Sequence, residues 1–192
     1  MGFTKAEQLF LGVQEPALND MLAAFYFERH RYFDFGSMLG PTTVSQTFFP
    51  ALNIFNTSIP WRVEISLPQI DIHPGAAALP APLVVGPGQF SGSTSIKITA
   101  AGFPFTFQLI FVGHVSQTGS GSSGTIRLII DQAKIVGLPP PLADLLAAVF
   151  VLIVNGILAN GTLPLSIFSF QPFNLVAGPI LGSNQVELRG NL

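Results

Sequence analysis

Residues 142–160 read LADLLAAVFVLIVNGILAN and predict a helix of about five turns. Pro141 suits a first helical position because its ring presets φ, and Gly161 suits the left-handed residue beyond a helix end. The helix is apolar on nearly every side, so it must be covered all round or lie in lipid. Spanning a bilayer takes about 20 apolar residues. Asp144 and Asn155 bound a shorter apolar run here, so we expect a buried core helix.

The composition predicts an unusually apolar domain. Charged residues make up 9% of the 192 residues, against about a quarter in ordinary soluble domains. Phenylalanine is in excess, with 18 residues against one Trp and two Tyr, which suggests either a Phe-rich core or an apolar ligand. The net charge of −2 and the scattered Lys and Arg argue against a nucleic-acid partner. The start MGFTKAEQ lacks a secretory pattern, so we expect a cytoplasmic location.

Strict alternation of side chains predicts a central antiparallel meander. Residues 90–99, 103–112 and 125–136 each place apolar side chains on one face, and the SQTGSGSSG segment at 116–124 predicts a loop before the last of them. Residues 61–67 form a further expected strand that continues to Ile72 after a bulge or bend at Pro68. Three more strands are expected near the end of the chain: 163–170, 173–181 and 184–192.

The N-terminal segment predicts a long helix. Thr4 and Glu7 form a possible capping box, and apolar residues follow at helical spacing as far as Tyr26, with a kink or restart at Pro16. Residues 42–60 are a strand or a loop, and residues 74–89 form a Pro-, Gly- and Ala-rich connection. We therefore predict one α+β domain over residues 1–192, with helices on a long antiparallel sheet.

No catalytic motif occurs, so we expect no enzyme, no metal and no cofactor. His30 lies at helical spacing from Asp34 and near Glu28, which could ligate a metal, but this composition is ordinary at a solvated helix end. The other two histidines are interpreted as surface or satisfied partners: His73 and His114. A cyclase or isomerase with an apolar cavity is an alternative, and it would need one of three acids: Asp71, Asp131 or Asp144.

Three segments resemble the TULIP superfamily of tubular lipid-binding proteins, which includes the bactericidal/permeability-increasing protein and juvenile-hormone carriers. They are the NGTLPL exit at 160–165, residues 173–180, and the strand at 186–192 that ends VELRGNL. The resemblance implies a twisted sheet that wraps around the long apolar helix and holds a lipid in the seam. Because the chain lacks cysteine and a signal pattern, it is more similar to an intracellular bacterial relative than to the secreted members.

With that resemblance, the apolar stripes of the strand and the helix become candidate ligand-binding residues. The helical residues lie at i, i+4, i+7 and i+11, on one side. The candidates are Phe103, Phe105, Phe107, Leu109, Phe111, Leu146, Phe150, Ile153 and Ile157. Each could also be plain core. We predict non-enzymatic binding of a lipid or another hydrophobic molecule in an elongated cavity, with peripheral membrane contact possible. The alternative is an assembly module whose apolar surface contacts copies of itself or a partner.

Overall fold

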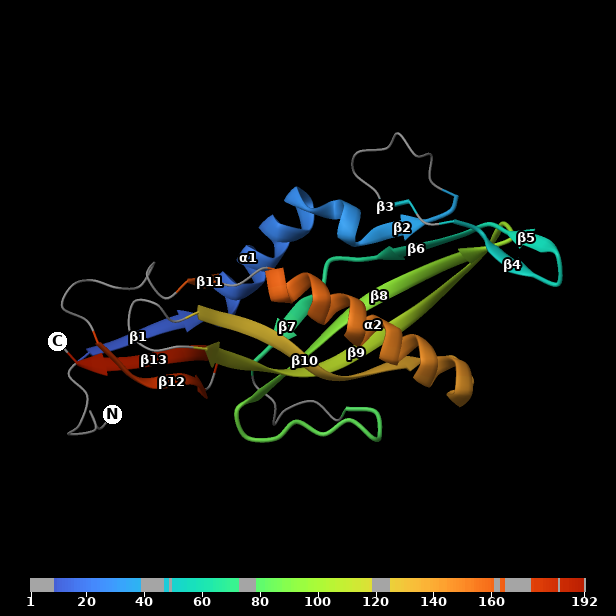
Figure 1. The fold of residues 1–192 in the computed structure, drawn as a ribbon. Coiled ribbons are helices and arrows are strands. Elements are labelled where there is room, and N and C mark those ends of the chain that lie inside the picture. Colours follow the sequence, from blue (N-terminus) through green and yellow to red (C-terminus); the bar gives the residue numbers. More distant parts are fainter. Residues whose placement is uncertain are drawn as a thin grey trace.

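The computed structural model describes residues 9–38, 47–48, 50–72, 79–118, 125–160, 163–164, 174–182 and 184–191. Within these ranges, two α-helices lie against a mostly antiparallel, curled sheet, which confirms the α+β class (Figure 1). The largest sheet has eight strands. A three-stranded sheet lies at one end of the elongated molecule, and a two-stranded hairpin lies at the other.

The three predicted central strands form the middle of the large sheet. They are β8 (Gln89–Ala100), β9 (Phe103–Thr118) and β10 (Thr125–Val136). β9 runs to Thr118 and so includes the first residues of the predicted loop at 116–124. β8 and β9 pair in one continuous register because Ala101 and Gly102 turn the chain tightly, with φ of 48° and 84°. This meander carries the main apolar face.

β10 has a bulge and a partly open outer edge. The register with β9 shifts between Ile130 and Gln132, so Asp131 is the extra residue. On the other side, β11 (Leu163–Pro164) pairs only with Thr125 and Ile126. Over the rest of its described length, β10 has a helix along this edge instead of a strand.

The remaining strands of the large sheet continue from β8. The two strands that flank Pro68 both pair with β8, as the predicted bend there requires. The short strands on this side of the large sheet are β2 (Asp34–Gly36), β3 (Thr47–Phe48), β6 (Trp61–Ile65) and β7 (Gln69–Asp71). The separate hairpin consists of β4 (Leu52–Ile54) and β5 (Thr57–Ile59). The segment 42–60 therefore contains strands where it is described.

The three-stranded sheet corrects the N-terminal prediction. β1 (Leu9–Gln14) is a strand and not the start of a helix, because it pairs along its whole length with β13 (Gln185–Asn191). β13 pairs in turn with β12 (Asn174–Gly182). Helix α1 (Glu15–Glu28) starts only after β1, with Pro16 in its first turn, where the missing N–H costs nothing. The short helix η1 spans His30–Tyr32. The proposed capping box at residues 4–7 lies outside the described residues.

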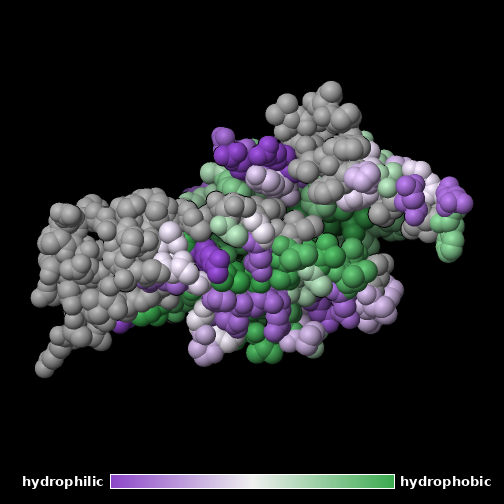
Figure 2. All heavy atoms as spheres, in the orientation of Figure 1, coloured by the Kyte–Doolittle hydropathy of each residue, from purple (hydrophilic) through white to green (hydrophobic). Residues whose placement is uncertain are grey.

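Helix α2 (Pro140–Asn160) forms as predicted, but the prediction that it is covered all round is wrong. Ala143, Ala147 and Phe150 are buried, whereas Leu145 and Leu152 are 61% and 74% exposed. The sheet reaches the helix from one side only. Figure 2 shows the resulting hydrophobic surface over α2. Neither helix in the described part of the chain combines the length and hydropathy needed to cross a bilayer.

The core lies between the helices and one face of the large sheet. Its most deeply buried large side chains include Phe90, Leu109 and Ile72. One ion pair sits at its border. The buried carboxylate of Asp34 accepts hydrogen bonds of 2.8 and 2.7 Å from the guanidinium of Arg62, and this contact raises the pKa of Arg62. The Arg62 guanidinium therefore compensates the negative charge of the Asp34 carboxylate at the border of the core.

Candidate functional site

An apolar pocket lies between α1, α2 and the inner face of the large sheet. Its volume is about 60 Å³. Residues from both helices, η1, five strands and two connecting segments line it: Leu22, Phe25, Tyr32, Phe33, Ile65, Pro68, Ile70, Phe90, Phe111, Leu128, Ile130, Phe150, Val154 and Leu158. Of these described residues, Tyr32 alone carries a side-chain polar group. The pocket therefore favours a ligand without charge.

Two glycines shape the floor of the pocket. A Cβ at Gly92 would lie 2.3 Å from the ring of Phe111, and a Cβ at Gly113 would lie 2.8 Å from the ring of Phe90. Each ring therefore lies across the neighbouring strand in the space that a side chain would fill. The ring of Phe111 also meets that of Phe150 on α2, with centroids 6.2 Å apart.

Aromatic residues from α1 and the turn after it close the other side. The ring of Phe25 lies 6.1 Å from Phe33 at an interplanar angle of 79°, a favourable edge-to-face arrangement. Tyr26 packs behind them, 4.8 Å from Phe33. Burial raises the pKa of Tyr26, and the carboxylates of Asp34 and Glu64 add to the shift. Its hydroxyl therefore stays neutral at neutral pH.

The predicted site residues fall into several groups. Phe111 and Phe150 line the pocket. Leu109 is fully buried in the core. Phe107 and Leu146 are partly buried and pack against that core. Phe103 is 68% and Phe105 is 51% exposed, and neither lines the pocket. The side chains of Ile153 and Ile157 lie outside the described part.

Phe103 and Phe105 are exposed because the neighbouring strand ends before reaching them. Val136, the last residue of β10, pairs with Gln108 of β9. The first residues of β9 thus extend past β10. The predicted stripe is continuous along β9, but only part of it is covered.

The contribution of α1 to the pocket could not be predicted from the sequence. Leu22 and Phe25 lie at helical spacing, but nothing in that pattern indicates which sheet face the helix covers. The predicted elongated cavity is also not seen among the described residues. A volume of about 60 Å³ is well below the roughly 150 Å³ of an engineered cavity that binds benzene.

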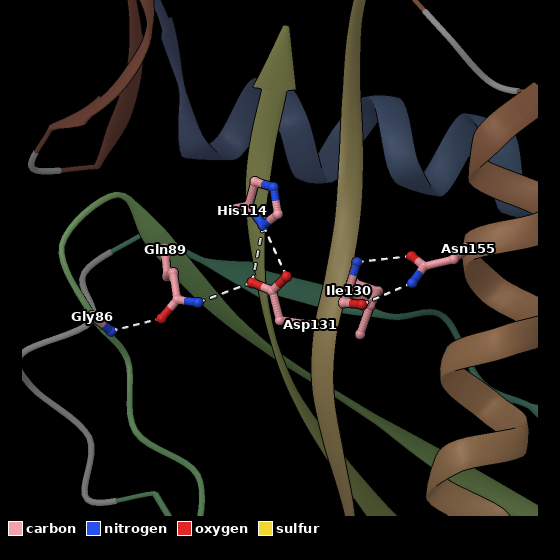
Figure 3. A network of polar contacts seen from close by, with 6 residues as sticks. All are labelled: Gly86, Gln89, His114, Ile130, Asp131 and Asn155. Atoms are coloured by element: carbon pink, nitrogen blue, oxygen red, sulfur yellow. Dashed lines mark hydrogen bonds and ion pairs between the residues drawn. The ribbon is translucent and has the colours of Figure 1, made fainter.

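Asn155 joins α2 to the open edge of β10. Its amide accepts a 2.8 Å hydrogen bond from the Ile130 N–H and donates one of 2.8 Å to the Ile130 carbonyl (Figure 3). The side chain thus takes the place of a neighbouring strand. Because Ile130 lines the pocket, this link also sets the position of α2 at the pocket wall.

A second polar network surrounds the bulge residue Asp131 (Figure 3). Its carboxylate lies 2.9 and 3.0 Å from Nδ1 of His114 and accepts a 2.9 Å hydrogen bond from Gln89. Gln89 accepts one of 2.8 Å from the Gly86 N–H. None of these residues lines the pocket, so the pair of His114 and Asp131 is placed to hold the strands and a loop together.

The other acids and histidines considered for chemistry are scattered. Asp144 is exposed on α2, and Asp71 lies on β7; neither lines the pocket. The ring of His30 packs edge-to-face on Tyr26, with centroids 5.0 Å apart. In the described residues no group of three acids or histidines could hold a metal ion. His73 lies outside the described residues.

Comparisons with known proteins assign no family to this chain. No family model matches the chain, and no curated protein does. One similar solved structure is the crystal structure of lipopolysaccharide binding protein, at 13% identity and a TM-score of 0.38. The similarity covers 100% of this chain and 45% of that one, so this chain spans less than half of that protein. At this TM-score the likeness is too weak to carry an argument, and membership of the TULIP superfamily stays a prediction.

Proposed function

We propose that this chain binds a slender, uncharged hydrophobic molecule, such as an acyl chain, between α1, α2 and the large sheet. The observation that carries the proposal is the pocket lining, in which Tyr32 supplies the one polar side-chain group among the described residues. Each methylene transferred into such a lining gains roughly 0.8 kcal/mol, so affinity needs no polar contact.

The pocket has to widen to admit such a ligand. At about 60 Å³ it holds only a small part of an acyl chain. Helix α2 is suited to move, because its outer side packs against little: Leu152 is 74% exposed and Val149 is 41% exposed. On its inner side, Phe150, Val154 and Leu158 face the pocket. A ligand would replace the contacts that these side chains lose.

Filling the pocket from α2 tests the proposal. Val154→Phe places a ring in the pocket, and we expect it to weaken binding of the fluorescent fatty acid cis-parinaric acid at least tenfold. Val154→Ala enlarges the pocket and should strengthen binding. The matched control is Leu152→Phe, a similar change on the exposed side of the same helix.

Titrations of probe fluorescence, with circular dichroism to verify folding, give the result. The proposal fails if folded wild-type protein binds no probe and lipid extraction with mass spectrometry finds no co-purified lipid. It also fails if Leu152→Phe weakens binding as much as Val154→Phe does.

Self-association is the second candidate, and the exposed apolar side of α2 favours it. Leu145, Val149 and Leu152 are exposed and follow one another at helical spacing. Light scattering of the same samples separates the two functions. A monomer that binds the probe supports the pocket, whereas an oligomer that binds none supports assembly through α2.

A further inference from the structure

Two tight hairpin turns carry exposed phenylalanines at the end of the molecule opposite the three-stranded sheet (Figure 1). Phe55 lies in the β4–β5 turn and is 98% exposed. Its φ of 49° is uncommon for a bulky residue. β9 begins directly after the β8–β9 turn with Phe103, 68% exposed, and Phe105, 51% exposed. We call Phe55, Phe103 and Phe105 the aromatic tip.

Hydrogen bonds join the two hairpins and pair polar groups near the turns. The Ala101 N–H donates to the Pro60 carbonyl at 2.9 Å. The indole Nε1 of Trp61 donates to the Pro50 carbonyl at 3.0 Å. Polar groups that enter an apolar phase need such internal partners, because no water is available there. The tip is therefore built so that its side chains can leave water at little cost to these groups.

The sequence around both turns is free of ionisable side chains. Residues 35–61 and residues 98–113 contain no Asp, Glu, Lys, Arg or His. Charges that flank these stretches pair with one another: Glu64 lies 3.1 Å from Arg62 and 3.0 Å from Lys97. A surface that contacts charged partners would need charge at the contact, so this end of the molecule fits a neutral partner.

We propose that the aromatic tip inserts into the interface of an uncharged phospholipid bilayer. Phe55 lies in one hairpin turn, and Phe103 and Phe105 lie just after another. A rigid protein partner would need a matching pocket at each place, whereas a fluid lipid phase adapts to them. Exposed apolar rings on a small, uncharged surface gain free energy on entering that phase. The inference concerns a part of the molecule away from the pocket and does not depend on it.

Trp61, the single tryptophan, is a built-in reporter at this end of the molecule. On addition of phosphatidylcholine vesicles, we expect its emission to shift to shorter wavelength and brominated phosphatidylcholine to quench it. Flotation with the vesicles measures binding directly. Phe55→Ser should lower the partition coefficient about tenfold, and adding Phe103→Ser should lower it further. Since Phe55 is almost fully exposed, its replacement leaves the fold intact.

The matched control is Phe27→Ser on α1, where the ring is 72% exposed. This variant should bind vesicles like the wild type. Raising the salt from 0.1 to 0.5 M should leave the vesicle binding of the wild type unchanged. Three results would overturn the proposal: no binding to phosphatidylcholine, binding that requires anionic lipid, or equal loss in the Phe27 and Phe55 variants. A wild-type oligomer in lipid-free solution that Phe55→Ser dissociates would also overturn it, in favour of a protein contact.

Discussion

Asn155 is a polar residue within the apolar helix α2, and its side chain links the helix to strand β10. Its side chain bonds both the N–H and the carbonyl of Ile130, with two distances of 2.8 Å. β11 pairs with β10 only at Thr125 and Ile126, so these main-chain groups have the amide in place of a strand. A carboxamide is the side chain that offers one donor and one acceptor in this spacing.

Replacing Asn155 with Leu should lower the free energy of unfolding by about 2–3 kcal/mol, because two partly buried main-chain groups lose their partner. Urea unfolding followed by circular dichroism measures the loss. Asp144→Ala, on the exposed side of the same helix, serves as the control and should change stability by less than about 0.5 kcal/mol. An unchanged midpoint for Asn155→Leu would contradict this role.

At the scale of elements, glycine is required by the packing of strand β8 but is unfavourable inside helix α2. Gly92 in β8 leaves room for the ring of Phe111, which a Cβ would approach to 2.3 Å. Gly156 in α2 has nothing within 4 Å of a Cβ position, and it sits in a helix interior, where glycine is unfavourable. One glycine is required by packing, and the other is dispensable.

Substitution of each by alanine should therefore change stability in opposite directions. Gly156→Ala should raise the free energy of unfolding by up to about 1 kcal/mol. Gly92→Ala should lower it by about 1–3 kcal/mol, since the Phe111 ring has to move. Denaturant titrations of the two variants compare them directly. Loss of stability in both variants would contradict the open space beside Gly156.

At the scale of the whole molecule, the three-stranded sheet is tied to the main core. Val186 of β13 is 6% exposed and belongs to the same buried cluster as Phe90 and Phe111. The chain thus joins β1, from its start, to β13, from its end, and packs them against the large sheet. Such packing predicts that both sheets unfold together.

Val186→Ala should lower the midpoint of urea unfolding, with a loss of about 2 kcal/mol for the removed methyl groups and the cavity. If the two sheets unfold together, the midpoint measured by Trp61 fluorescence, at the opposite end of the large sheet, shifts by the same amount as the midpoint measured by circular dichroism. Separate transitions would mean that the two sheets unfold independently.

The three central strands and α2 could be predicted from the sequence because their patterns are local. Alternation along 90–99, 103–112 and 125–136, and the continuous apolar run of 142–160, are properties of each segment alone. The class of the fold and the mainly apolar character of the candidate site follow from them. Of the seven predicted site residues whose side chains are described, Phe111 and Phe150 line the pocket, and their role in ligand binding stays a prediction.

The tertiary structure alone decided which apolar faces are covered. Leu9–Gln14 is a strand because β13, far along the chain, pairs with it. Phe103 and Phe105 continue the stripe of Phe111, yet they are exposed because β10 ends at Val136. Periodicity shows which side chains share a face, whereas burial depends on whether another element reaches that face. That depends on where distant strands and helices end, which no local pattern contains.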